Sequence, residues 1–123
     1  MITGSCHCGA VHIAVVEAPT MVTACNCSIC RRLGTLWAYY RPDQVTLTHA
    51  PGATDAYSWD DKSIAFRRCA TCGCTTHWES ITDPPIDRMG VNARLLDIDL
   101  ERVEVKKLDG ASYPTSTGSR RSD

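Results

Sequence analysis

The sequence of 123 residues predicts a single, mainly β domain. Short segments rich in β-branched and aromatic residues recur along the chain, and Pro, Gly and Asp separate them, as is typical of strands joined by tight turns. The cysteines occur in groups of two or three, with one or two residues between neighbouring cysteines, a spacing that lets the thiolates of a group bind one zinc ion. The eight cysteines form three such clusters, which are Cys6 and Cys8, then Cys25, Cys27 and Cys30, then Cys69, Cys72 and Cys74.

Five segments have the alternating composition of strands, and we expect strands at Val11–Val15, Trp37–Tyr40, Val45–Thr48, Ser63–Arg67 and Arg102–Lys106. One short helical turn is expected after the central cysteines, where Ser28 can cap Ile29–Leu33 and Gly34 can end the turn in a left-handed conformation. The segment Ile81–Asp87 is expected to be a loop, because its two consecutive prolines cannot donate hydrogen bonds to a sheet.

The domain is expected to span residues 1–115, followed by a flexible polar tail at 116–123. The first residues have neither a basic region nor an apolar region of the kind that directs export, which predicts a cytoplasmic protein. No segment approaches the roughly 18 apolar residues of a membrane helix. The net charge of -1 gives no general electrostatic reason to bind nucleic acid, so a small-molecule ligand is expected.

The first and last cysteine clusters are expected to form one closed metal site. Cys6 and Cys8 flank a single residue, and Cys69 and Cys72 form the Cys-x2-Cys-Gly turn of a zinc knuckle. Four thiolates from these two segments complete a structural zinc site that joins the start of the chain to its middle. Buried, inert thiols are the alternative, but such residues have no reason to recur at ligand spacing.

The central cysteines Cys25, Cys27 and Cys30 lie at the start of the expected helical turn and have no fourth ligand nearby in the sequence. A metal held by three protein thiolates keeps one position free for a substrate thiolate, which makes this group the catalytic candidate. Two alternatives stay open. Cys27 and Cys30 can form a redox pair, or a distant residue can supply the fourth ligand, the candidates being Cys74, His7, His49 and His77.

Residues around the central cysteines offer a substrate site, each with a structural alternative. Arg31 is the candidate to bind a substrate carboxylate, although it and the arginine that follows it point in different directions on a helix. Trp37, Tyr39 and Tyr40 either line a pocket or pack in the core, and alternating aromatic residues on a strand favour the core. Cys74 is expected to pack as a small apolar side chain.

Four stretches carry a resemblance to a known family, and they are Gly4–Val11, Cys25–Gly34, Phe66 with Cys69–Gly73, and Val91–Arg94 with Asp109–Gly110. They are similar to the glutathione-dependent formaldehyde-activating enzyme family, which also contains centromere protein V. The resemblance spans nearly the whole chain. Seven cysteines in the same order and spacing make it specific, whereas the elements at Asn92 and at Asp109–Gly110 alone are weak signals.

The resemblance implies a β-tent fold, in which small antiparallel sheets surround zinc, and two Zn²⁺ ions per chain. It implies that one ion is structural, held by Cys6, Cys8, Cys69 and Cys72, and that the other is catalytic, held by Cys25, Cys27 and Cys30. Members of the family are carbon–sulfur lyases that join glutathione and formaldehyde reversibly into S-hydroxymethylglutathione. The chain is therefore expected to be a lyase resembling S-(hydroxymethyl)glutathione synthase, with glutathione as its thiol and no general acid or base evident from the sequence.

A second class of function stays open, which is a non-catalytic zinc module that binds a protein or nucleic-acid partner. A pocket that opens onto the central cysteines would favour the enzyme. A continuous basic face would favour the binding module, and its members would be Arg31, Arg32, Arg67, Arg68, Arg120 and Arg121. The sequence indicates neither the physiological substrate nor the oligomeric state.

Overall fold

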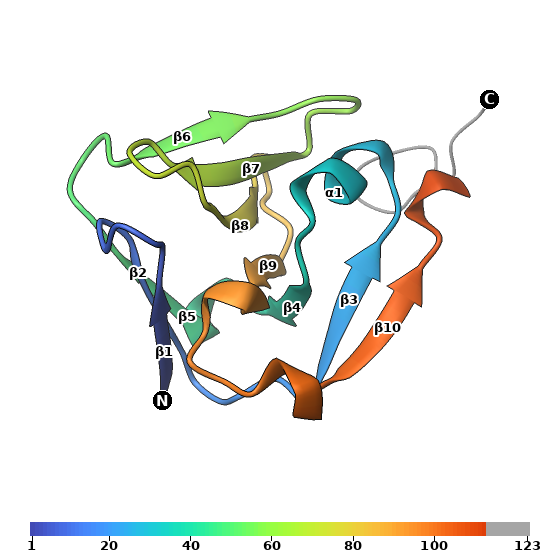
Figure 1. Cartoon of the computed structure of the whole chain (residues 1–123). Helices are drawn as coiled ribbons and strands as arrows, with labels where there is room; N and C mark the ends of the chain where they lie inside the picture. The colour runs from blue at the N-terminus through green and yellow to red at the C-terminus, as the bar shows by residue number, and fades with distance from the viewer. Residues whose placement is uncertain (113–123) are drawn as a thin grey trace.

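The computed structural model describes residues 1–112, which form two β-sheets (Figure 1). The small sheet has three antiparallel strands in the order β1-β2-β5, and the large sheet has seven in the order β10-β3-β4-β9-β8-β7-β6. The mainly β prediction is confirmed. The strands are β1 (Ile2–Ser5), β2 (His12–Val15), β3 (Met21–Cys25), β4 (Trp37–Tyr40), β5 (Val45–Thr48), β6 (Thr54–Tyr57), β7 (Ile64–Cys69), β8 (Thr75–Ser80), β9 (Met89–Asn92) and β10 (Glu104–Leu108).

The expected helical turn is present as α1 (Ser28–Leu33), but its N-cap differs from the prediction. Cys27 occupies the cap position and its sulfur accepts a hydrogen bond from the backbone N–H of Cys30, so the prediction that Ser28 caps the helix is wrong. Gly34 ends the helix as expected, with φ 67° and ψ 27°, a conformation in which a side chain would be strained. Four short 3₁₀ turns complete the structure, at Pro42–Gln44, Ala93–Leu95, Leu100–Arg102 and Gly110–Ser112.

Strands β4 and β5 have the bounds that the sequence predicts, and β2 and β7 begin one residue later than expected. Strand β10 begins two residues after the predicted start and pairs with β3 in parallel, with Leu108 opposite Cys25. This parallel pair, visible at one edge of the large sheet in Figure 1, brings the end of the described chain next to the central cysteines.

The main core lies between the two sheets, because the inward-facing side chains of the small sheet meet those of β3, β4 and β9. Tyr40 belongs to this core, and its hydroxyl donates a hydrogen bond to the carbonyl of Glu17 at 2.9 Å. The buried members of the core are Ile13, Val15, Val22, Ala38, Tyr40, Met89, Val91, Ala93 and Leu96.

The predicted loop at Ile81–Asp87 contains no strand, in agreement with its proline content. Within residues 1–112, none of the helices has the length and the apolar character needed to span a membrane. The predicted tail at 116–123 and the domain end at residue 115 lie outside the described residues, so the C-terminal boundary stays a prediction.

Candidate metal centres

Two turns that are far apart in the sequence bring four thiols together. Cys6 and Cys8 lie in the turn between β1 and β2, and Cys69 and Cys72 lie at the turn between β7 and β8, with all four sulfurs within 4.8 Å of one another. The Cys6 and Cys8 sulfurs are 3.7 Å apart, and those of Cys8 and Cys69 are 3.5 Å apart. Zinc–sulfur bonds of about 2.3 Å in a tetrahedron require sulfurs about 3.8 Å apart, so the group fits zinc.

Backbone N–H groups contact these thiols and favour the ionised form of two of them, Cys69 and Cys72. The N–H of Val11 donates to Cys6 Sγ at 3.3 Å, and the N–H of Cys72 donates to Cys69 Sγ at 3.5 Å. Backbone N–H groups, that of Cys74 first, lower the pKa of Cys72 to about 5. Thiolates are the form that binds zinc, so these contacts favour metal binding by the turn that holds Cys69 and Cys72.

A metal ion in this four-thiol group would join the two sheets. The β1–β2 turn belongs to the small sheet and the β7–β8 turn to the large one, and Figure 1 shows the two turns at the same end of the molecule. Cys74 packs against the buried cluster of Cys6, Val11 and Cys69, but its sulfur is not one of the four that come together.

The three central thiols also meet, and the local fold explains how. Cys25 ends β3, Cys27 caps α1 and Cys30 lies in the first turn of the helix, so the sharp change from strand to helix gathers their sulfurs within 4.8 Å of one another. Within residues 1–112 no further His, Cys, Asp or Glu contributes a ligand atom to this three-thiol group, and that includes the four residues considered from the sequence, Cys74, His7, His49 and His77.

Three N–H groups point at the sulfurs of the three-thiol group. The backbone N–H of Cys27 donates to Cys25 Sγ at 3.5 Å, that of Cys30 donates to Cys27 Sγ at 3.4 Å, and the Trp37 indole Nε1–H donates to Cys30 Sγ at 3.3 Å. Contacts with Cys25 first and then Cys30 lower the pKa of Cys27 to about 2, whereas contacts with Cys25 first and then Cys27 raise the pKa of Cys30. A divalent cation in this group would compensate the charge of three thiolates.

The segment after β10 closes one side of the three-thiol group. The Asn26 side chain donates to Asp109 Oδ1 at 3.1 Å and accepts from the backbone N–H of Ala111 at 2.9 Å, which fixes the position of Gly110. A Cβ at Gly110 would overlap Cys25 Sγ, so only glycine fits against this sulfur. The Ser112 and Asn26 side chains lower the pKa of Asp109, which keeps the carboxylate charged as their acceptor.

Aromatic side chains cover another side of the three-thiol group. Trp37 is 1% exposed and packs with Cys27 and Cys30 in a second buried cluster, where its ring lies 6.1 Å from that of Phe66. The preference for core positions therefore holds for Trp37 and for Tyr40. Tyr39 is only partly buried and packs against the same cluster, so one of the three aromatic residues borders the thiols at the surface.

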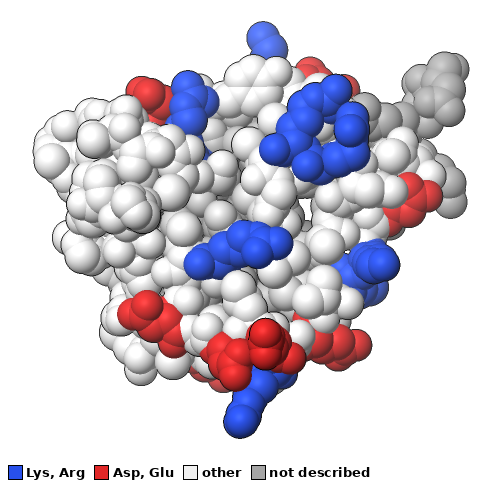
Figure 2. Space-filling model, in the orientation of Figure 1, with Lys and Arg blue, Asp and Glu red and all other residues white. Residues whose placement is uncertain are grey.

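The arginines that the sequence analysis singled out occupy different places. Arg31 is exposed on α1, directly after Cys30, whereas Arg32 donates to the carbonyl of Ser28 at 2.8 Å. Arg67 forms an ion pair with Glu79 at 2.8 Å. On the face shown in Figure 2, Lys and Arg form separate groups with Asp and Glu concentrated along the lower edge, so this face carries no continuous basic surface.

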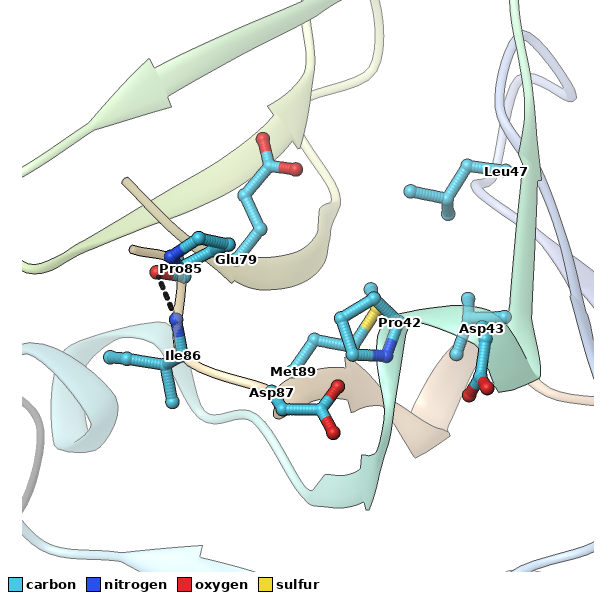
Figure 3. A pocket seen from close by; sticks show the side chains of 10 residues that line it. Pro42, Asp43, Leu47, Glu79, Pro85, Ile86, Asp87 and Met89 are labelled. Atoms are coloured by element: carbon cyan, nitrogen blue, oxygen red, sulfur yellow. Dashed lines mark hydrogen bonds between the residues drawn. The ribbon is translucent and has the colours of Figure 1, made fainter. Parts of the chain in front are cut away.

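A cleft of about 630 Å³ lies between β5 of the small sheet and β8 and β9 of the large one (Figure 3). Two of its three carboxylates already have partners, since Arg41 lies 3.2 Å from Asp43 and Arg67 lies 2.8 Å from Glu79. None of the cysteines lines this cleft, which separates it from the thiol groups. Its lining residues are Pro42, Asp43, Val45, Leu47, Glu79, Ser80, Pro85, Ile86, Asp87 and Met89.

A β fold that carries a four-thiol and a three-thiol group defines the class of this protein as a β domain with two cysteine clusters that could hold metal ions. More particularly, the chain belongs to the glutathione-dependent formaldehyde-activating enzyme family, whose model matches residues 1–107. Its fold is similar to the crystal structure of a Rhodobacter sphaeroides protein, with a TM-score of 0.70 and 26% sequence identity over 85% of this chain and 99% of that chain. The family supports a function of the glutathione-dependent, formaldehyde-activating type.

Sequence reasoning missed two contributions to the three-thiol group. Asn26 and Asp109 entered the sequence analysis only as members of the stretches that carry the resemblance, and they lie 83 positions apart, so their contact was not foreseen. Trp37 was weighed as a pocket or core residue, and nothing in its neighbours indicates that its N–H meets Cys30. Both roles depend on the pairing of distant strands, which local sequence patterns do not report.

Proposed function

We propose that this protein joins a thiol, glutathione in the first place, with formaldehyde, as a carbon–sulfur lyase resembling S-(hydroxymethyl)glutathione synthase. One observation carries the proposal: the three-thiol group gathers three sulfurs and no fourth ligand within residues 1–112. Such a group leaves room for a substrate thiolate. Membership of a formaldehyde-activating family supports the choice of electrophile.

We propose that Cys25, Cys27 and Cys30 hold a catalytic zinc ion, and that a structural zinc ion is held by Cys6, Cys8, Cys69 and Cys72. Zinc in the three-thiol group would supply a positive charge that keeps a bound substrate thiol ionised at neutral pH. The surrounding N–H groups, including Trp37 Nε1–H, stabilise the charge on the protein's own sulfurs and hold them in place.

In the proposed reaction the thiolate sulfur of glutathione attacks the carbon of formaldehyde. A carbon–sulfur bond forms, the π electron pair of the carbonyl moves to oxygen, and that oxygen takes a proton from water, so the product is S-hydroxymethylglutathione. The reverse path releases the two reactants. Arg31, exposed beside Cys30, binds a carboxylate of glutathione in this proposal, while Trp37 and Tyr39 keep water from one side of the sulfurs.

Cobalt-loaded protein tests the proposal. We expect glutathione to intensify the thiolate-to-Co²⁺ absorption, because a fourth sulfur joins the metal, whereas S-methylglutathione has no effect. Exchange NMR at a pH where the spontaneous addition is slow should then show faster hemithioacetal formation with the parent protein than with Cys30→Ser. Cys74→Ser is the matched control, since it makes the same change at a cysteine outside the three-thiol group. If glutathione and S-methylglutathione give the same absorption spectrum, the proposed thiol site is refuted.

A cytoplasmic location fits the same proposal. All eight cysteines are free thiols in the structure, and both proposed zinc sites need them reduced. A reducing compartment is therefore where we place the protein.

A further inference from the structure

Arg88 stands out among the cations of the described chain because of its contact with an aromatic ring. It lies directly before β9, and its guanidinium carbon is 3.9 Å from the centre of the Tyr39 ring. The side chain is exposed, and within residues 1–112 it forms no ion pair. A guanidinium held over a ring keeps a defined orientation while its N–H groups stay available for an anion.

Most other arginines of the described chain are already engaged. Three form ion pairs, and these are Arg41 with Asp43, Arg67 with Glu79 and Arg102 with Asp99. Two more donate to backbone carbonyls, Arg32 to Ser28 and Arg94 to Gly34. Arg88 is thus a fixed cation without a carboxylate partner in the described part of the protein.

Tyr39 links Arg88 to the three-thiol group. It packs against the buried cluster that contains Cys27 and Cys30. Because the Arg88 guanidinium lies over this ring, the packing of Tyr39 places Arg88 on the exposed border of the three-thiol group.

The ring under Arg88 is itself held in place. Trp78 of β8 lies against Tyr39, with ring centres 6.2 Å apart and an angle of 60° between the planes. The indole in turn packs on Gly90 of β9, where a Cβ would overlap its Nε1. Three neighbouring strands thus build a rigid base for the guanidinium, which lowers the entropy that Arg88 loses when it binds an anion.

We propose that Arg88 is a specificity-determining residue that binds a carboxylate of the thiol substrate while the substrate sulfur occupies the three-thiol group. The inference deepens the proposed function and rests on it, because it names the substrate class as thiols that carry a carboxylate. A guanidinium binds a carboxylate through two parallel hydrogen bonds. Glutathione has two carboxylates, so Arg88 and Arg31 each have one to bind.

The test compares three thiols on the cobalt-loaded full chain, with the thiolate-to-Co²⁺ absorption as the readout. Glutathione and 3-mercaptopropionate carry a carboxylate, whereas 2-mercaptoethanol does not. We expect Arg88→Gln to weaken binding of the first two by about 10- to 100-fold and to leave 2-mercaptoethanol unchanged, since a hydrogen bond to a charged group is lost. Arg88→Lys should recover part of the loss, and Arg102→Gln, which removes an exposed cation paired with Asp99, should change nothing.

The outcomes separate the inference from the proposed function. Equal weakening of all three thiols by Arg88→Gln would mean that Arg88 only supports the fold of the site, and unchanged binding of all three would mean that it binds no carboxylate. Either result overturns the inference while the thiol site stands. If none of the thiols alters the spectrum of the parent protein, the proposed function fails, and the role of Arg88 in it fails as well.

Discussion

Replacing Trp37 with Phe removes one hydrogen-bond donor from the three-thiol group and keeps an aromatic ring in its place. The indole Nε1–H lies 3.3 Å from Cys30 Sγ, and the two side chains are 1% and 7% exposed. Water therefore has little access to replace the lost donor. The sulfur of a metal-bound Cys30 would keep its negative charge with one stabilising contact fewer.

The expected loss of metal affinity follows from two independent considerations. A hydrogen bond to a charged group contributes about 1.5–3 kcal/mol, which corresponds to a change in affinity of about 10- to 150-fold. Groups that donate hydrogen bonds to metal ligands typically change metal affinity by about 10- to 100-fold when they are removed. We therefore expect Trp37→Phe to weaken zinc binding in the three-thiol group by about 10- to 100-fold.

The smaller ring also leaves a gap in the core, and this effect has to be separated from the first. Trp37 packs against Phe66, and loss of buried volume lowers the free energy of unfolding. This loss acts on the metal-free and the metal-bound protein alike, so it largely cancels in a binding constant. Phe66→Leu is the matched control, because it removes aromatic volume from the same cluster and no donor.

Titration of the zinc-loaded protein with a coloured chelator measures the two ions separately. In Trp37→Phe the zinc ion of the three-thiol group should transfer to the chelator at a lower chelator concentration than in the parent. The zinc ion of the four-thiol group should transfer as it does in the parent. Phe66→Leu should match the parent in both steps. If both variants shift the first step equally, packing and not the hydrogen bond governs the affinity, and an unshifted Trp37→Phe refutes the contribution of the indole N–H altogether.

Cys6→Ser should lower the melting temperature much more than Cys27→Ser, because a metal in the four-thiol group would join the two sheets. If Cys6→Ser melts like the parent while Cys27→Ser collapses, the structural and catalytic roles of the two thiol groups have been assigned the wrong way round. Contacts with His77 first and then Arg67 lower the pKa of Glu79 from its ordinary 4.5 to about 2. This contribution to stability is present above pH 4.5 and is lost as the pH falls towards 2. The free energy of unfolding measured in urea should therefore differ more between the parent and Glu79→Gln at pH 6 than at pH 3. An equal difference at the two pH values would contradict the lowered pKa of Glu79.

Local patterns predict the elements whose residues alternate regularly. Strands β4 and β5 match their predicted bounds because each is a short β-branched or aromatic segment between clear turn residues. The left-handed Gly34 also follows from local chemistry, since glycine is the residue that ends a helix in this way. The thiols could be foreseen for a similar reason, because ligand spacing within a turn is a property of neighbouring residues.

Features that depend on distant contacts were not predictable in this way. Strand β9 contains Gly90, which weakens a strand pattern, and the reason for the glycine is the Trp78 ring that packs on it. The N-cap of α1 was assigned to Ser28 because serine is a common cap, yet the Cys27 sulfur accepts the N–H of Cys30. Sulfur took the place of oxygen because the same turn gathers the three thiols.

The contacts of the three-thiol group also limit how a substrate can reach it. Gly110 lies against Cys25 so closely that a methyl group does not fit, and Trp37 covers Cys30 in the buried cluster. These two sides are closed to a ligand. Tyr39 is partly exposed and lies near both the sulfurs and the Arg88 guanidinium. In the proposed function, a thiol that approaches along this border would meet the Arg88 guanidinium before it meets the three sulfurs, an order that would favour an anionic thiol.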